Sequence, residues 1–187
     1  MTNRERLKDL LVRRSVRLGD FTLASGAKSD YYIDARLTTM SAEGQLLIGQ
    51  VAWELVQESG LNPTHVGGLT LGADPISYAI AHRSALEGSP IDAFTVRKQA
   101  KEHGTGQLIE GGLPANGRAL MIEDTMTTGR STMKAVEAVR AHGTEIVGVL
   151  TIVNRSESAQ AMFDAEGLTL LSIFSGTELV DAARAAS

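Results

Sequence analysis

The sequence contains no cysteine, few aromatic residues and no long apolar run, and each absence excludes a class of protein. Without cysteine there is no disulfide framework, thiolate nucleophile or cysteine-bound zinc or iron–sulfur site, and a reducing compartment fits. The longest apolar runs, such as Ala119–Ile122, are far too short to span a bilayer. The charged first ten residues lack the apolar centre of a signal peptide. We therefore expect a cytoplasmic protein with no membrane partner.

The chain also lacks an excess of positive charge. Its formal net charge is −4, and aromatic residues make up 4% of it. Nucleic-acid binding usually needs a basic field, and single strands need aromatic side chains on which bases stack. We therefore expect no nucleic-acid partner. Basic residues are concentrated in one stretch, 97–103, with the sequence RKQAKEH, where a small polyanion could be held.

The length of 187 residues and the 43% hydrophobic content suit one ordinary domain. Residues 4–15 carry leucines at helical spacing, and residues 21–23 and 31–33 resemble two short strands around a turn. The prediction is a single domain over 1–187 in which residues 1–40 form an N-terminal hood.

From Ser41 onward, helical and strand patterns alternate. The helices are expected at 41–60, 75–86, 130–142 and 157–166, and the strands at 66–69, 91–96, 118–123, 145–153 and 168–174. Strands separated by helices favour parallel pairing with right-handed crossovers. The fold class is therefore α/β, with an open, mainly parallel twisted sheet covered by helices on both faces. Ligands of such sheets bind at the carboxyl ends of the strands. The connection 98–116 shows no periodicity and is long enough to be functional.

The most informative stretch is 119–132, with the sequence ALMIEDTMTTGRST. It begins as a buried strand, which we expect to end at two acids, Glu123 and Asp124, and continues as a hydroxyl-rich turn that opens a helix. Backbone N–H groups of the turn and the positive end of the helix dipole can bind a phosphate, with Thr128, Ser131 and Thr132 hydroxyls as further donors. The two acids are placed to accept hydrogen bonds from vicinal sugar hydroxyls. Together these features indicate a site for ribose 5-phosphate.

A turn with an N-cap explains the hydroxyl residues alone equally well. The order of two acids, two threonines, a glycine and a serine at one strand-to-helix junction favours the functional interpretation. The stretch is neither a Walker A loop nor a dinucleotide-binding fingerprint, because neither glycine pattern occurs.

Residues 122–129, IEDTMTTG, resemble the phosphoribosyl pyrophosphate motif of the type I phosphoribosyltransferases. Two other segments are similar to motifs of the orotate phosphoribosyltransferases within that family. They are residues 21–32, FTLASGAKSDYY, and the basic segment 96–104, VRKQAKEHG. Arg155, directly after the expected strand 145–153, stands where these enzymes place an orotate-binding arginine.

The resemblance implies a role for each of these residues. Pyrophosphate would be bound by Arg97, Lys98, Lys101 and His103, and the ribose phosphate by Glu123, Asp124, Thr125, Met126, Thr127, Thr128, Gly129, Arg130 and Ser131. Orotate would be bound by Thr127, Arg155, Tyr32, Ile33 and Lys28. Lys98, Lys101, His103 and Asp124 would be the catalytic residues. Lys28 is equally explained as a solvated turn residue. For Arg155 the alternative is a surface ion pair with Glu157, which would contribute little.

The resemblance implies transfer of 5-phosphoribosyl from phosphoribosyl pyrophosphate to N1 of orotate, giving orotidine 5′-monophosphate in pyrimidine biosynthesis. Mg²⁺ is the implied cofactor, held mainly by substrate and water rather than by a protein cage. A homodimer is also implied, with the 98–116 loop of one subunit closing over the site of the other. Many members have lysines where this chain has Ala24 and Gly72. Two alternatives stay open: a transferase for another base, and a regulator that senses phosphoribosyl pyrophosphate without turnover.

Overall fold

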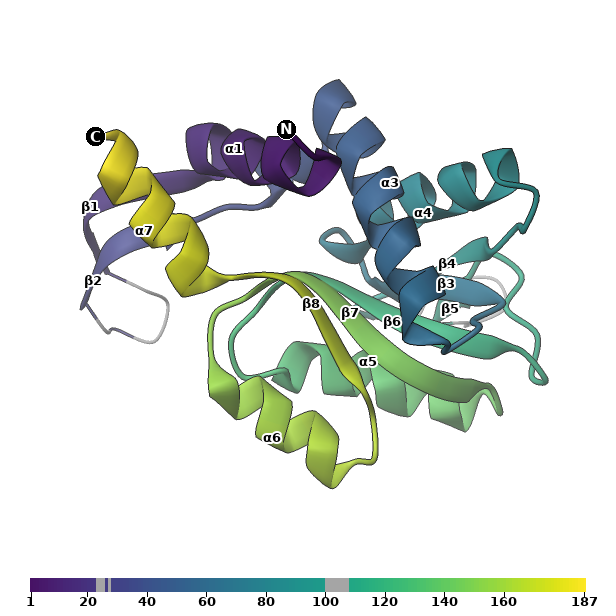
Figure 1. The fold of residues 1–187 in the computed structure, drawn as a ribbon. Coiled ribbons are helices and arrows are strands. Elements are labelled where there is room, and N and C mark those ends of the chain that lie inside the picture. Colours follow the sequence, from purple (N-terminus) through teal and green to yellow (C-terminus); the bar gives the residue numbers. More distant parts are fainter. Residues whose placement is uncertain (23–25, 27, 100–107) are drawn as a thin grey trace.

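The computed structural model describes residues 1–22, 26, 28–99 and 108–187. Its centre is a six-stranded sheet with the order β5-β4-β3-β6-β7-β8 (Figure 1). These strands are β3 (His65–Leu69), β4 (Asp92–Val96), β5 (Ile109–Glu110), β6 (Arg118–Met126), β7 (Glu145–Asn154) and β8 (Leu170–Ser175). Neighbouring strands are parallel except β4 and β5, which are antiparallel. The predicted open, mainly parallel sheet is confirmed.

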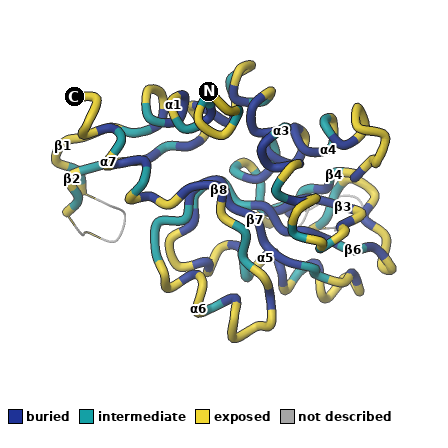
Figure 2. Tube along the Cα trace, in the orientation of Figure 1, coloured by how far each residue is buried: buried dark blue, intermediate teal, exposed yellow. Residues whose placement is uncertain are grey.

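Helices cover both faces of this sheet (Figures 1 and 2). Helices α3 (Ala42–Ser59) and α4 (Ala73–Leu86) lie on one face, and α5 (Arg130–Ala141) and α6 (Glu157–Ala165) lie on the other. Side chains of β6 alternate between the two faces, as a strand requires. Leu120 and Ile122 join one buried cluster, while Ala119 and Met121 join the second.

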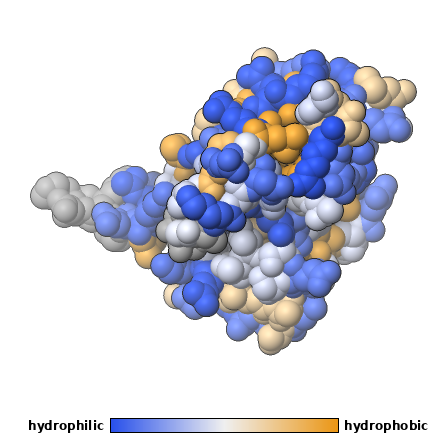
Figure 3. Space-filling view, turned by 90° about the vertical axis from the view of Figure 1, so that its left-hand side faces the viewer, coloured by the Kyte–Doolittle hydropathy of each residue, from blue (hydrophilic) through white to orange (hydrophobic). Residues whose placement is uncertain are grey.

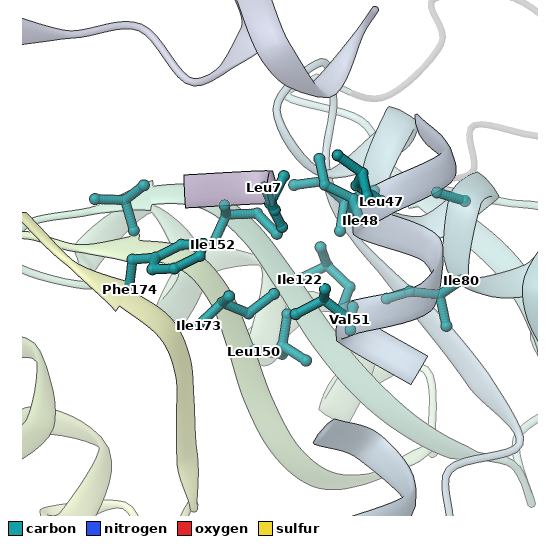
Figure 4. Packing of buried hydrophobic residues seen from close by; sticks show 14 of the residues in the cluster. Leu7, Leu47, Ile48, Val51, Ile80, Ile122, Leu150, Ile152, Ile173 and Phe174 are labelled. Atoms are coloured by element: carbon teal, nitrogen blue, oxygen red, sulfur yellow. The ribbon is translucent and has the colours of Figure 1, made fainter. Parts of the chain in front are cut away.

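The larger cluster attaches α3 and α4 to the sheet. Figure 4 shows Ile122 and Leu150 of the sheet beside Leu47, Ile48 and Val51 of α3. Its labelled residues other than Val51 and Ile173 are at most 1% exposed, so this face of the sheet is closed to water. Apolar burial of this kind is the main stabilising contribution to a fold.

The ends of α3 agree with the prediction from the sequence. Ser41 Oγ accepts a hydrogen bond from the Gly44 amide at 3.1 Å, as a helix N-cap does. Gly60 ends the helix with φ of 68°, in the left-handed region that glycine enters without steric cost.

A second layer lies beside the central sheet. It consists of α1 (Asn3–Ser15), the antiparallel pair β1 (Val16–Thr22) and β2 (Lys28–Ile33), and the short α2 (Arg36–Thr39). The C-terminal helix α7 (Gly176–Ala186) packs against α1 and β1 (Figure 1). The sequence patterns did not identify α2 or α7. The grouping of residues 1–40 as a hood stays a prediction, and the observed layer also contains a helix from the other end of the chain.

Two further differences from the sequence-based prediction concern the sheet. Strand β6 does not end at Glu123 but continues to Met126, because β7 runs alongside it as far as Asn154. Both acids therefore lie within the strand. The segment 98–116 contains β5, whose Ile109 and Glu110 pair with Val96 and Thr95 at the sheet edge.

The surface is largely hydrophilic on the side that carries α7 and the two-stranded sheet. Figure 3 shows polar residues over most of this face, with apolar residues gathered in a small patch. Within the described ranges, the helices are all too short or too polar to cross a membrane.

Candidate active site

A cavity of about 430 Å³ opens at the carboxyl edge of the central sheet. Five chain segments form its wall: the end of β6 with the turn after it, the turn after β3, and the residues that follow β2, β4 and β7. The lining residues are Tyr32, Ile33, Asp34, Ala35, Arg36, Leu69, Thr70, Leu71, Gly72, Lys98, Glu123, Asp124, Thr125, Thr127, Ser131 and Arg155. Eight of the candidates named from the sequence thus share one cavity with Lys98. Asp34–Arg36 and Leu69–Gly72, which were given no binding role, line it as well.

A smaller cavity of about 140 Å³ adjoins the first at the turn between β6 and α5. It is lined by Glu123, Thr125, Met126, Thr127, Thr128, Gly129, Arg130, Ser131 and Thr132. Gly129 is the N-cap of α5 with φ of 75°, and an added Cβ would lie 3.0 Å from Phe163. Both the conformation and the close packing therefore require glycine here. The first-turn N–H groups of α5 open toward this concavity, which is the geometry that binds phosphate.

Glu123 lies where the two cavities meet. Its Oε2 accepts a 2.8 Å hydrogen bond from Thr132 Oγ1. Burial raises the pKa of Glu123 to about 7, opposed by the Thr132 hydrogen bond and reinforced by the neighbouring Asp124 charge. The Thr132 hydroxyl, expected to contact phosphate, is 2% exposed and bonded to Glu123 instead.

Asp124 is held by its own backbone neighbour. Its Oδ1 accepts a 2.7 Å hydrogen bond from the Thr125 amide. Directly opposite, Gly72 approaches so closely that an added Cβ would lie 2.8 Å from the same oxygen. The absence of a side chain at Gly72 therefore allows the carboxylate its position.

Arg155 comes from the end of β7, where its backbone amide donates to the Met126 carbonyl at 2.8 Å. Its guanidinium carbon lies 5.3 Å from the centre of the Tyr31 ring, which is a cation–π contact. The Arg155 Nε and the Thr125 hydroxyl are buried, and neither has a hydrogen-bond partner within the described residues. Buried polar atoms at a cavity wall without partners indicate that a polar ligand supplies them. No ion pair between Arg155 and Glu157 occurs in this described region, so that alternative is not supported.

The sequence did not single out Asp34 and Arg36. Arg36 donates to both carboxylate oxygens of Asp34, at 2.9 and 3.0 Å. This paired contact lowers the pKa of Asp34 and fixes the guanidinium at the cavity wall. Their position directly after Ile33, a residue already placed at the site, is the signal that could have identified them.

The turn after β3 was named from the sequence only because many members have a lysine at the position of Gly72, and it was given no role in this chain. Asp74 ties it to β4, because its two carboxylate oxygens accept hydrogen bonds from Thr70 at 2.7 Å and Thr95 at 2.8 Å. This turn follows a parallel strand next to β6, so the rule that ligands bind at the carboxyl edge would have predicted it.

Among the described residues, two candidates line neither of these two cavities. Arg97 contacts Glu110 at 3.7 Å and lines another cavity of about 590 Å³, which shares Thr70 and Lys98 with the main cavity. Lys28 lies on β2, where its Nζ donates to Thr22 Oγ1 at 2.8 Å. Lys101 and His103 lie outside the described residues.

The sequence matches known proteins over nearly its whole length. Residues 41–168 match the model of the phosphoribosyl transferase domain. The chain belongs to the phosphoribosyltransferase family. It is 45% identical over 183 residues to the orotate phosphoribosyltransferase of Aquifex aeolicus, covering 96% of this chain and 99% of that protein. It is 46% identical over 177 residues to the Mycobacterium leprae enzyme of the same name, covering 95% and 96%.

A solved structure agrees with these relatives. The orotate phosphoribosyltransferase of Mycobacterium tuberculosis H37Rv in complex with 5-phospho-α-D-ribosyl 1-diphosphate is 41% identical, with a TM-score of 0.81. The alignment covers 95% of this chain and 99% of that one. The phosphoribosyltransferase model begins at residue 41, so the contribution of Tyr32–Arg36 to the cavity lies outside it. The alignments with the Aquifex aeolicus and Mycobacterium leprae enzymes span 96% and 95% of this chain and therefore include these residues.

Proposed function

We propose that this protein is an orotate phosphoribosyltransferase, which forms orotidine 5′-monophosphate and pyrophosphate from orotate and phosphoribosyl pyrophosphate. The observation that carries the proposal is that Arg155 lines the same cavity as the two acids and the phosphate-binding turn. One cavity thus offers a place for a phosphate, for a sugar diol and for a carboxylate. The full-length relatives of the same name support this reading.

The ribose 5-phosphate is bound by β6 and the turn after it. Backbone amides of residues 127–131 and the first turn of α5 hold the phosphate in the smaller cavity. Glu123 and Asp124 accept hydrogen bonds from the ribose hydroxyls where the cavities meet. The buried Thr125 hydroxyl is placed to donate to the same substrate.

Orotate is bound at the Arg155 side. A guanidinium and a carboxylate form paired hydrogen bonds, and Arg155 still has an unpaired buried Nε. Tyr32, Ile33 and Thr127 complete this part of the wall. The Tyr31 ring restricts the Arg155 guanidinium from the other side. Purines and uracil have no carboxylate group, so they cannot form this contact with Arg155.

Orotate N1, which attacks as an anion after its proton passes to solvent, forms a bond to ribose C1 while the bond from C1 to the pyrophosphate oxygen breaks. The electron pair of the broken bond leaves with pyrophosphate, and the ribose becomes positively charged in the transition state. Carboxylates of Glu123 and Asp124 favour that positive charge, whereas Lys98 is placed to neutralise the leaving group. We assign Lys101 and His103 to the leaving group as well, with one of them as proton donor. Catalysis is thus mainly positioning and electrostatics.

Mg²⁺ is part of the proposal. When bound, it neutralises charge on the pyrophosphate oxygens, and substrate and water supply most of its ligands. The described residues contain no group of three or more acidic, histidine or cysteine side chains arranged for a metal. Glu123 and Asp124 on the cavity wall suit a cation carried on the substrate, and no side chain is assigned as its direct ligand.

We also propose a cytoplasmic homodimer in which residues of the 98–116 loop close over the partner's site. Arg97 lines only the cavity of about 590 Å³, whereas Lys98 lines both that cavity and the main one. Lys98 serves its own cavity under this proposal, and the basic residues around it serve the partner. The cytoplasmic location is supported by the absence of cysteine from the sequence.

The test is consumption of orotate by the pure protein with phosphoribosyl pyrophosphate and Mg²⁺, with uracil and hypoxanthine as controls. We expect orotate alone to be converted at a substantial rate. Faster conversion of uracil or hypoxanthine would assign the enzyme to another base. Binding of phosphoribosyl pyrophosphate without turnover of any base would favour the sensing regulator.

A further inference from the structure

Thr132 is the buried polar residue of the site that the proposed mechanism does not use. It lies in the first turn of α5, is 2% exposed, and donates its hydroxyl to Glu123 Oε2 at 2.8 Å. Because the hydroxyl already donates to Glu123 and the residue is buried, the Thr132 side chain has no exposed polar group that could bind a substrate. This hydrogen bond connects α5, the helix that follows the phosphate-binding turn, to Glu123, which faces the ribose under the proposed function.

The contact selects one orientation of the Glu123 carboxylate. A carboxylate has two oxygens, and Thr132 occupies Oε2. Glu123 lines both cavities, so its carboxylate faces the space that a ligand would fill. Without the hydroxyl, the carboxylate would lose a buried partner and would be free to rotate about its last torsion, which is broad in glutamate.

We propose that Thr132 is a positioning residue that orients Glu123 toward the ribose hydroxyls and links this orientation to occupancy of the phosphate-binding turn. The inference rests on the proposed function, because it takes phosphoribosyl pyrophosphate as the ligand. Phosphate bound at the turn orders the first turn of α5, and Thr132 transmits that order to Glu123.

The proposal has a pH signature. The Thr132 hydrogen bond favours the ionised form of Glu123, so removing the hydroxyl raises the pKa of that carboxyl further. The charged and titratable groups around Glu123 stay the same in such a variant. They are Asp124 on β6, Lys98 after β4, Arg155 after β7, Arg130 on α5, and Tyr32, Asp34 and Arg36 from the N-terminal layer.

The experiment measures binding of phosphoribosyl pyrophosphate with Mg²⁺ by calorimetry between pH 6 and 8.5, without orotate. Thr132→Val and Thr132→Ala remove the hydroxyl, and Thr132→Ser retains it. Thr144→Val is the matched control, because Thr144 is also buried and donates to the Pro114 carbonyl at 3.0 Å away from the cavity. Titration of the ligand itself is common to all variants and cancels between them.

We expect Thr132→Val and Thr132→Ala to weaken binding about tenfold at pH 7, the effect of losing one hydrogen bond to an ionised group. The pH at which binding is half-maximal should rise, while Thr132→Ser and Thr144→Val should bind as the wild type does. Equal dissociation constants and pH dependence in Thr132→Ala and Thr144→Val would overturn the proposal. A wild type that binds this ligand but does not convert orotate would reject only the base assignment.

Discussion

Gly72 lies against the Asp124 carboxylate, with room for no side chain between them. An added Cβ would be 2.8 Å from Oδ1 and 3.0 Å from the carboxyl carbon. Gly72 has φ of −61° and ψ of −44°, which any residue adopts, so only the contact with the Asp124 side chain opposes a larger residue here. We therefore expect Gly72→Ala to displace Asp124.

Gly72→Ala should lower kcat/KM for phosphoribosyl pyrophosphate at least about tenfold, because small displacements of a positioned group are costly. The melting temperature should change little, since alanine suits this backbone conformation. Kinetics and a thermal melt on the same preparation would check both. Full activity in the variant would show that the carboxylate has room to move without loss.

Asp124→Asn tests the carboxylate directly. The amide has the same shape but no charge, so we expect turnover to fall about a hundredfold or more while the fold is retained. Steady-state kinetics and circular dichroism would measure the two effects. Loss of the cooperative melt would instead make Asp124 a structural acid.

Arg155→Ala should weaken orotate binding by about 2 to 4 kcal/mol and affect phosphoribosyl pyrophosphate far less. The measurement is the KM for each substrate. Tyr31→Phe is the matched control, because it keeps the ring beside Arg155 and should leave both values close to wild type. Equal increases for the two substrates in Arg155→Ala would reject its role in base recognition.

The pKa of Glu123 predicts how stability depends on pH. It is raised by burial from 4.5 to about 7, so the folded state binds the proton more tightly than the unfolded state. The resulting stabilisation is complete below pH 4.5 and is lost as the pH rises through about 7. Glu123→Gln cannot ionise, so it should be more stable than the wild type at pH 8, by at most about 3 kcal/mol, and should not gain at pH 4. Denaturant unfolding at both pH values measures this, and parallel curves for the two proteins would contradict it.

Subunit mixing tests the shared site. Lys101→Ala and Asp124→Asn subunits should each be inactive alone. After subunit exchange, some hybrid dimers would pair one intact loop with one intact ribose-phosphate site, and activity should return. Exchange is verified by mass spectrometry of tagged subunits. An inactive mixture with complete exchange would place the loop over the site of its own chain.

The sequence predicted best what local patterns determine. Alternating patterns located the strands of the parallel sheet, and the 119–132 stretch placed Glu123, Asp124 and the phosphate-binding turn together. It predicted less well what depends on distant pairing. The continuation of β6 to Met126 depends on β7, and the bond from Thr132 to Glu123 depends on how α5 turns back over the strand.

Arg36 and α7 were missed for related reasons. Arg36 belongs to a helix of four residues, too short for a periodic pattern, and its place in the cavity depends on the bond to Asp34. Helix α7 is amphipathic, but its partners α1 and β1 are at the other end of the chain.

The packing of α7 on α1 has a consequence for the order of folding. Arg4 and Glu178 form an ion pair across 174 residues of sequence, so this contact closes a loop of nearly the whole chain. Contacts of such high sequence separation are made slowly, and during synthesis α7 leaves the ribosome after all its partners. The central sheet can pair its strands before then. A nascent chain would therefore form the turn between β6 and α5 first and the packing of α7 on α1 and β1 last.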